Sequence, residues 1–505
     1  MHGTLEALDI AILLSYFAAM ILIGLYLSRR CRTAEQFMVA GRSIPAWAAG
    51  LAVMSTYTSS ISYIATPGKA YESNWHPFIF SLCIIPVAWF VCKYAVPYYR
   101  TRRLISVYAF LEERLGAWGR VYAALSFLLY MVGRIAVILY LVGLLVSKFL
   151  PAGYLSPGQL ISLAIVVVGL VTIVYTLLGG MEAVVWTDVV QSAVMIVGIA
   201  FCAISLSRDI LTGSQPLVHA AIDKGKFSLG TWDLSLSSRT VWVMIIYGVT
   251  ENLRNLMADQ NFVQKYSSVA TERQAKHSIW MAMLIYIPLT AVFLYIGTAL
   301  FAFYLGGDEL ARAGITKGDE VFPHFIATQL PAGLKGLVIA AIVAAAMSTL
   351  DSALNCSATV MLLDFCKRYF RPTLGDKASI LFLRLATAAW GLVGTGFALL
   401  MIRANSALDV WWQISGIFGG GILGLFILSM LRVRLKMWQG LTAIGVSIAV
   451  ISWGTFARSL PANWRWAQCN LDGIIVGAVG TAALIAAAIA LGAVPKSKTK
   501  NQCRT

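Results

Sequence analysis

Charged residues are scarce in this 505-residue sequence, since Asp, Glu, Lys and Arg make up only 12% of it, against about 25% in soluble domains. The five histidines lack the spacing of a zinc site, and the eight cysteines lack the spacing of a disulfide framework. The sequence has no nucleophile–base pairing and no phosphate-binding Gly loop, which argues against an enzyme. Its net charge of +16 is spread between apolar blocks, without a basic tract that would indicate nucleic acid.

Apolar residues dominate the chain. Hydrophobic residues account for 59% of it and the mean hydropathy is +0.76, which places the protein in a lipid bilayer. The first apolar block runs from Asp9 to Ser28, roughly the twenty residues that cross a membrane. No basic leader or cleavage site precedes this block, so we expect it to be retained. Nothing in the chain resembles a separate soluble domain, and we expect one membrane unit over residues 1–505.

Hydropathy predicts an all-α integral membrane protein with about thirteen spans. These cover residues 9–28, 45–70, 77–97, 121–149, 158–178, 182–206, 239–265, 277–304, 333–366, 377–402, 409–431, 436–456 and 471–494. Basic residues follow alternate spans, including Lys265, Arg273 and Lys276 after the seventh. The positive-inside rule makes those faces cytoplasmic, so we expect the N-terminus outside and the C-terminus inside a bacterial-type plasma (inner) membrane. The long external connections, 207–238 and 305–332, are either lids or plain linkers.

Polar residues interrupt the second span. From Ser55 to Tyr63 every residue except Ile61 carries a hydroxyl group, and Pro67 and Gly68 follow. Hydroxyl groups replace backbone partners where a membrane helix unwinds, and unwound carbonyls coordinate sodium in transporters. A Ser/Thr-rich contact between intact helices is the alternative.

The ninth span carries a second polar cluster, in the stretch Ala341 to Asn355. An alanine and three hydroxyl-bearing residues recur there at helical spacing and so share one face, with an acid three residues beyond the first serine. Such oxygens suit a hard cation, although small residues at this spacing also suit close packing. An acid in a membrane needs a partner, and a cation is the natural one. The residues are Ala345, Ser348, Thr349, Asp351 and Ser352.

Two further charges lie at membrane depth. Gly179 and Gly180 predict a turn between two spans, and Asp188 follows about two helical turns later. That acid either binds a second cation or pairs with a Lys or Arg near the cytoplasmic surface. Arg134 stands alone in an apolar span and either binds a carboxylated substrate or pairs with Glu251, an acid that has its own helical neighbour, Arg254.

Four segments carry a resemblance to a known family: GGMEAVVWTDVVQ (179–191), ADQNFVQKY (258–266), AAAMSTLDSALN (344–355) and DVWWQISGIFGGGILGLF (409–426). They resemble the sodium:solute symporter family, which includes glucose, proline, pantothenate and sialic-acid carriers. The similarity covers essentially the whole chain. Within the family, PAWAAG (45–50) and GRIAVILYL (133–141) are most similar to bacterial sodium/sialic-acid symporters.

The resemblance implies a LeuT-type core of two inverted five-helix repeats, 45–206 and 239–431, with one extra helix (9–28) before and two (436–494) after. It implies a sodium site formed by Ser55, Thr58, Ala345, Ser348 and Thr349. It also implies an additional sodium site formed by Asp188, Ser348, Asp351 and Ser352. The implied substrate pocket holds a carboxylate at Arg134 and is lined by Ser59, Ser62, Tyr57, Ser81 and Asn252.

Three positions depart from the sialic-acid carriers. Tyr57 replaces a small hydroxyl residue, Ser81 a glutamine, and Asp351 a serine, so the identity of the solute is open. We expect a monomeric symporter that uses Na⁺ to import a small, anionic solute, such as sialic acid. A monocarboxylate, an amino acid or a neutral sugar is the alternative cargo, and a membrane sensor is the alternative function. Whether one or two sodium ions move per cycle is also open.

Overall fold

The structure is a computed structural model that describes residues 5–495 except 148, 150–154, 213–216, 404–406, 432, 458–463, 465, 466 and 493. The described part is helical apart from two short antiparallel strands, β1 (Val433–Arg434) and β2 (Val494–Pro495). Long apolar runs with few charges form helices because only a helix satisfies every backbone group within lipid. The all-α class predicted from the sequence is therefore confirmed.

The first half of the chain contains the first of the broken helices. Its elements are α1 (Ala7–Ser28), α2 (Ala34–Val39), η1 (Ala40–Arg42), α3 (Ala46–Tyr57), α4 (Ser60–Glu72), α5 (Phe78–Thr101), α6 (Tyr108–Leu115), α7 (Ala117–Ser147), α8 (Pro157–Thr212) and α9 (Leu217–Asp223).

The second half contains another interrupted helix, between α10 and α11. Its elements are α10 (Val241–Leu253), η2 (Arg254–Ala258), α11 (Gln260–Ser267), α12 (Glu272–Phe303), α13 (Glu309–Arg312), α14 (Gly318–Gln329), α15 (Leu334–Val360), η3 (Met361–Phe370), α16 (Asp376–Leu400), η4 (Met401–Arg403), α17 (Ala407–Met430), α18 (Met437–Phe456), η7 (Gly473–Ile475) and α19 (Val476–Ala490).

Nine helices in the described residues are long and apolar enough to cross a membrane, or ten if one bent pair counts as a span. One of the nine, Gly158–Arg208, contains two predicted spans, and other predicted spans fall on helices divided at a break. The count of about thirteen spans therefore remains a prediction, because the two halves of a broken span are separate helices that are each too short to be counted as a span.

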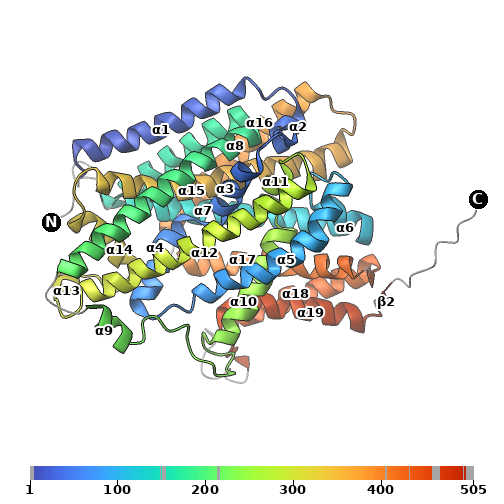
Figure 1. Cartoon of the computed structure of the whole chain (residues 1–505). Helices are drawn as coiled ribbons and strands as arrows, with labels where there is room; N and C mark the ends of the chain where they lie inside the picture. The colour runs from blue at the N-terminus through green and yellow to red at the C-terminus, as the bar shows by residue number, and fades with distance from the viewer. Residues whose placement is uncertain are drawn as a thin grey trace, which may run out of the picture.

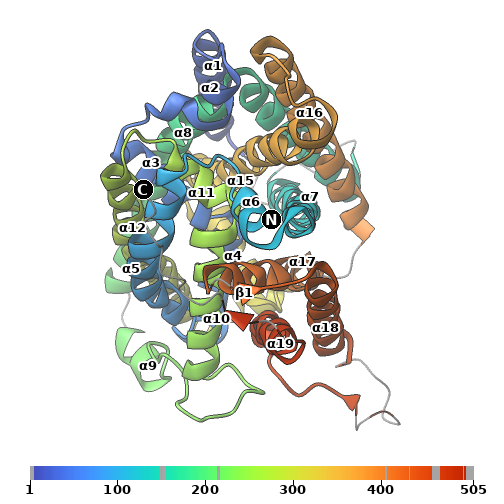
Figure 2. The ribbon, with the colours of Figure 1, turned by 90° about the vertical axis from the view of Figure 1, so that its right-hand side faces the viewer.

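The long helices run roughly parallel in one bundle, with α2 and α6 at one end and α9, α13 and α14 at the other (Figure 1). Viewed end-on, α4, α11 and α15 lie in the interior, whereas α1, α16 and α18 lie on the rim (Figure 2). Every residue of α15 from Val338 to Val360 is buried, as expected for a helix surrounded by others. Polar groups carried by α15 are therefore shielded from lipid.

Gly180 makes the turn that was predicted between two spans. It has φ 58° and ψ −149°, a backbone conformation that only glycine adopts readily. A Cβ atom at this position would lie 2.9 Å from the Cα atom of Phe37 in α2. The turn thus needs glycine both for its dihedral angles and for the close approach of α2.

Gly180→Ala is accordingly expected to destabilise the protein by about 1–3 kcal/mol through backbone strain, with the clash in addition. The measurement is thermal unfolding in detergent, where the variant should melt at a lower temperature. Gly396→Ala is the matched control, since no atom lies within 4 Å of its added Cβ and alanine favours a helix interior. Equal melting of the two variants would show that the turn tolerates a side chain.

Both long connections contact α4. Gly318 at the start of α14 donates its N–H to Glu72 Oε1 at 2.7 Å, and Lys226 Nζ donates to the carbonyl of Tyr71 at 2.6 Å. Lys226 also lies 4.0 Å from the ring centroid of Phe301. In the same region burial lowers the pKa of His76 to about 4, so this side chain is neutral near pH 7. These contacts hold both connections against α4, which favours the interpretation as lids over the interpretation as plain linkers.

Candidate transport site

The predicted interruption of the second span is present. The span forms two helices, α3 and α4, and Thr58 and Ser59 between them are extended, with ψ angles of 97° and 174°. Side-chain hydroxyl groups before the break bond back to the preceding turn of α3: Ser55 and Thr56 both donate to Ala52 O, at 2.9 and 2.8 Å. The local sequence explains this, because Ser and Thr side chains compete with the helical backbone for hydrogen bonds.

A second break, which the sequence analysis missed, lies in the predicted seventh span, 239–265. Residues 254–258 widen into a π-helix, Asp259 is extended with ψ 116°, and α11 begins at Gln260. The Asp259 side chain accepts a hydrogen bond from the N–H of Asn261 at 2.9 Å and so caps α11. An aspartate before a helical stretch is a recognisable N-cap signal, which an apolar window average conceals.

The predicted sodium ligands lie on α3, the break that follows it, and α15, two helices that contact each other. Ser55 and Ser348 are brought together, since both hydroxyl groups lie beside the carboxylate of Asp188. Thr349 Oγ1 donates to Ala345 O at 3.2 Å within α15. Ser348 Oγ is buried and has no hydrogen-bond partner among the described residues. An orphaned hydroxyl in an oxygen-rich interior fits a cation ligand.

Asp188 has a partner that the sequence analysis misplaced. Lys265 was counted among the cytoplasmic basic residues, but its side chain is fully buried and its Nζ lies 2.8 Å from Asp188 Oδ2. Of the two alternatives for Asp188, the structure shows the ion pair, with both side chains fully buried. A charged side chain at the end of a span is buried when another helix supplies the opposite charge.

Asp351, which was assigned to the additional sodium site, is surrounded by hydroxyl groups. Its Oδ2 accepts from Tyr175 OH at 2.8 Å and from Thr187 Oγ1 at 3.4 Å, and its Oδ1 accepts from Ser352 Oγ at 3.1 Å. Ser352 also donates to Ser348 O at 2.8 Å. Hydroxyl donors from α8 and α15 therefore compensate this buried carboxylate.

Arg134 lies in the wall of a cavity of about 200 Å³ beside the first break. Its Nη2 donates to the carbonyl of Thr56 at 3.3 Å, and no carboxylate among the described residues lies within ion-pair distance of it. The alternative partner, Glu251, is held by Arg254, whose Nε lies 3.0 Å from Glu251 Oε2. The guanidinium of Arg134 thus has donors left for a ligand.

Three of the predicted pocket residues, Tyr57, Ser59 and Ser62, line this cavity. Two others do not. Ser81 Oγ donates to Thr290 Oγ1 at 3.2 Å, and Asn252 Nδ2 donates to the carbonyls of Phe80 and Gly248 at 3.0 and 2.7 Å. Each lies on a helix that borders the cavity but one residue away from the lining position, a rotation of about 100° around the helix axis.

Four of the residues missed in the wall follow helical spacing. Tyr130 and Ile138 lie four residues to either side of Arg134, and Tyr247 and Asn255 do the same around Glu251. Counting in steps of four from each charged residue would have found them. Aromatic rings form part of the cavity wall, where Tyr57 packs against Phe262 and Tyr286 at centroid distances of 4.6 and 5.0 Å.

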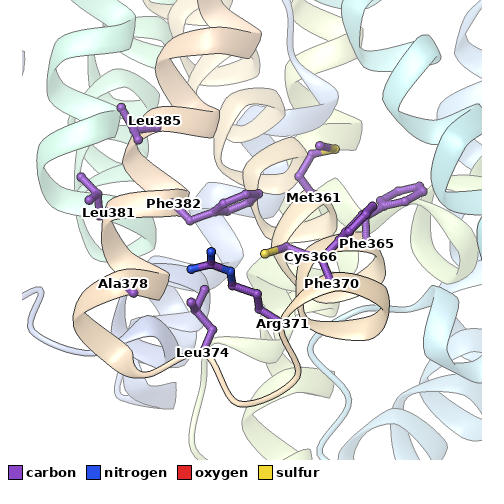
Figure 3. Close-up of a pocket in the computed structure, with 10 residues that line it drawn as sticks. All are labelled: Met361, Phe365, Cys366, Phe370, Arg371, Leu374, Ala378, Leu381, Phe382 and Leu385. Atoms are coloured by element: carbon purple, nitrogen blue, oxygen red, sulfur yellow. The ribbon is translucent and has the colours of Figure 1, made fainter.

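Another hollow of about 500 Å³, between η3 and α16, has a different character (Figure 3). Arg371 is the one charged residue in its lining, which is otherwise apolar apart from Cys366, and the Arg371 side chain points from the end of η3 toward α16. It lacks the clustered oxygens found beside Arg134. An apolar groove on a membrane-spanning surface is expected to face lipid chains, so we do not assign the solute to it.

The geometry agrees with comparisons to known proteins. Residues 37–445 match the model of the sodium:solute symporter family. The chain belongs to this family. It is 30% identical to the sodium/sialic acid symporter SiaT of Proteus mirabilis, with 95% of this chain and 96% of the relative covered. It is 26% identical to sodium-coupled monocarboxylate transporter 2 of Mus musculus, with 91% and 74% covered.

Comparison with solved structures supports the assignment to this family. A sodium-coupled sialic acid symporter in a substrate-bound, outward-open state superposes with a TM-score of 0.86 at 29% identity, covering 97% of this chain and 99% of that one. The nucleobase-cation-symport-1 transporter MHP1 superposes with a TM-score of 0.53 at 15% identity, covering 91% of this chain and 94% of that one, which shows the fold alone. The protein is thus a multi-span sodium-coupled solute symporter with a LeuT-like fold, and not an enzyme.

Proposed function

We propose that this symporter uses the sodium gradient to import a small carboxylated solute across the plasma membrane. The observation that carries the proposal is Arg134, a guanidinium without an acidic partner among the described residues, in the wall of a cavity. An unpaired cation at membrane depth is unfavourable, and a carboxylate matches the planar fork of its donors. The solute is thus the missing counter-charge.

The sodium site of this proposal comprises Ser55, Thr58, Ala345, Ser348 and Thr349. It is supported by the extended backbone at Thr58, the contact of α3 with α15 and the orphaned hydroxyl of Ser348. A cation bound there would tie the broken helix to α15 and stabilise the outward-open form. Rocking of the first repeat, residues 45–206, against the second, residues 239–431, would then expose the solute to the cytoplasm.

The repeats and the orientation belong to the same proposal. The two broken spans would occupy equivalent positions in the two repeats, which supports the assignment of 45–206 and 239–431. In this arrangement the N-terminus is outside and the C-terminus is cytoplasmic, and the protein acts as a monomer. Labelling of single cysteines in intact cells would test the orientation.

Sialic acid is the first candidate solute, because SiaT of Proteus mirabilis, at 30% identity, is named for it. The cavity favours a smaller second candidate. Its volume of about 200 Å³ lies below the 300–1,000 Å³ typical of ligand sites, and Tyr57 fills part of the wall. A monocarboxylate, the class named for the mouse relative, would satisfy Arg134 and need less space.

The test is uptake by purified protein in proteoliposomes, with an inward gradient of sodium or of choline. Radiolabelled N-acetylneuraminate, pyruvate, proline and glucose serve as solutes. We expect a carboxylated solute to accumulate under the sodium gradient and not to accumulate when choline replaces sodium. Equal uptake of every solute in choline would refute sodium coupling, and uptake of glucose alone would refute the role of Arg134.

Replacing Tyr57 by serine should widen the cavity and shift selectivity toward the larger acid. Removing an aromatic wall changes discrimination by more than a methylene group does, and a methylene group is worth about 10–200-fold. We expect the ratio of N-acetylneuraminate to pyruvate uptake to rise at least about tenfold. Tyr57→Phe is the control, since Tyr57 OH has no hydrogen-bond partner among the described residues. An unchanged ratio in Tyr57→Ser would show that this ring does not limit solute size.

A further inference from the structure

The ammonium group of Lys265 occupies an oxygen cage inside the bundle. Nζ lies 2.8 Å from Asp188 Oδ2 on α8, 2.6 Å from Thr56 Oγ1 and 3.0 Å from Ala52 O on α3. Two of these contacts, to Thr56 Oγ1 and Ala52 O, are hydrogen bonds, and the third is the ion pair with Asp188. A carboxylate, a hydroxyl and a carbonyl oxygen are also the ligands that a sodium ion would use.

The position of this cage matters for transport. Lys265 belongs to α11, which follows the second break, while Thr56 and Ala52 belong to α3, which precedes the first break. Asp188 lies beside Ser55 and Ser348, two residues of the proposed sodium site. The fixed ammonium therefore lies next to the proposed sodium site. It joins the two interrupted helices directly, through Ala52 and Thr56, and it contacts α8 through Asp188.

The charge of Asp188 is already balanced. Its carboxylate and the ammonium group of Lys265, both fully buried, form an ion pair that is neutral without a carried ion. The carboxyl group of Asp351 has three hydroxyl donors of its own. A second sodium ion beside Asp188 would therefore be an uncompensated positive charge in a medium that solvates it poorly.

We propose that Lys265 is a built-in cation that takes the place of a second sodium ion beside Asp188, so that the symporter binds a single sodium. This rests on the proposed function, because it assumes that the first sodium is carried. The unpartnered oxygens, Ser348 Oγ and Asp188 Oδ1, mark the position left for that one ion. With a monocarboxylate as cargo, transport moves no net charge.

The experiment counts sodium ions on the purified protein by equilibrium binding of radioactive sodium, without any solute. We expect one ion per wild-type chain. In Lys265→Met the uncovered Asp188 should bind a second ion, and in Asp188→Asn/Lys265→Met, which removes both charges, the count should return to one. Lys335→Met is the matched control, a buried lysine at the start of α15, and should bind one ion.

Each result decides the matter. Two ions on the wild type, or one ion on folded Lys265→Met, would overturn the role of Lys265. Lys265→Gln, which keeps a donor for Ala52 and Thr56, replaces the methionine variant if that one does not fold, with the same expected count of two. No sodium on the wild type would instead refute the proposed function, so the two failures are distinguishable.

Discussion

Arg134→Ala is expected to weaken the uptake of a carboxylated solute strongly while leaving sodium binding intact. Loss of one partner of a desolvated, hydrogen-bonded charge pair costs about 2–5 kcal/mol, and every 1.4 kcal/mol is tenfold in affinity. The half-saturating solute concentration should therefore rise at least about 30-fold. The reason lies in the cavity, where Arg134 donates to Thr56 O and meets no acid among the described residues.

Arg134→Lys refines this expectation. Lysine keeps the charge but presents a point charge in place of a planar fork, so its affinity should lie between those of the wild type and the alanine variant. Uptake in proteoliposomes, measured over a range of solute concentrations, gives all three values. Arg273→Ala, an exposed arginine near the start of α12, is the control and should behave as wild type. Normal uptake by Arg134→Ala would remove the anchor from the proposal.

Thr349→Ala should weaken sodium activation by about 10–100-fold. A hydrogen bond or ligand contact to a charged group contributes about 1.5–3 kcal/mol, and Thr349 is a proposed sodium ligand in a fully buried position. Its other contact, to Ala345 O at 3.2 Å, lies within its own helix and adds little to stability. The measurement is the sodium concentration that gives half-maximal uptake or half-maximal thermal stabilisation.

Two variants separate this effect from a structural one. Thr387→Ala removes a buried threonine with the same contact to the preceding turn, 2.8 Å to Leu383 O, in α16, outside the site. It should leave sodium activation unchanged. Thr349→Ser keeps the hydroxyl and should recover most of the affinity. If Thr349→Ala responds to sodium as the wild type does, the sodium site lies elsewhere.

Much of the architecture is encoded locally in the sequence. Apolar blocks predict spans because lipid accepts only segments with satisfied backbones, and the paired glycines predict the turn at Gly180 because few residues adopt its dihedral angles. The run of hydroxyl-bearing residues that begins at Ser55 predicts the first break, because Ser and Thr side chains compete with the helical backbone for hydrogen bonds. The pairing of Glu251 with Arg254 was also foreseeable, since residues three apart face each other on a helix.

The cavity wall was only partly predictable. Arg134 was found because a charged group in an apolar span usually faces the bundle interior or a cavity rather than lipid, and Tyr57, Ser59 and Ser62 were placed there through family resemblance. Ser81 and Asn252 were placed in the wall through family resemblance, yet their neighbours Phe80 and Glu251 line it instead. A helix turns by about 100° per residue, so the correct helix can be predicted while the residue that faces the cavity is predicted wrongly.

The sequence alone determined the membrane class, the family resemblance, the first broken helix and the isolated arginine, because each depends on residues that are neighbours along the chain. Only the tertiary structure decided that Lys265 lies on Asp188 in the interior and that Arg134 has no acid nearby among the described residues. The physical reason is that a buried charge is compensated by whatever group packing brings to it. That group lies on another helix, at a sequence separation that no local pattern records.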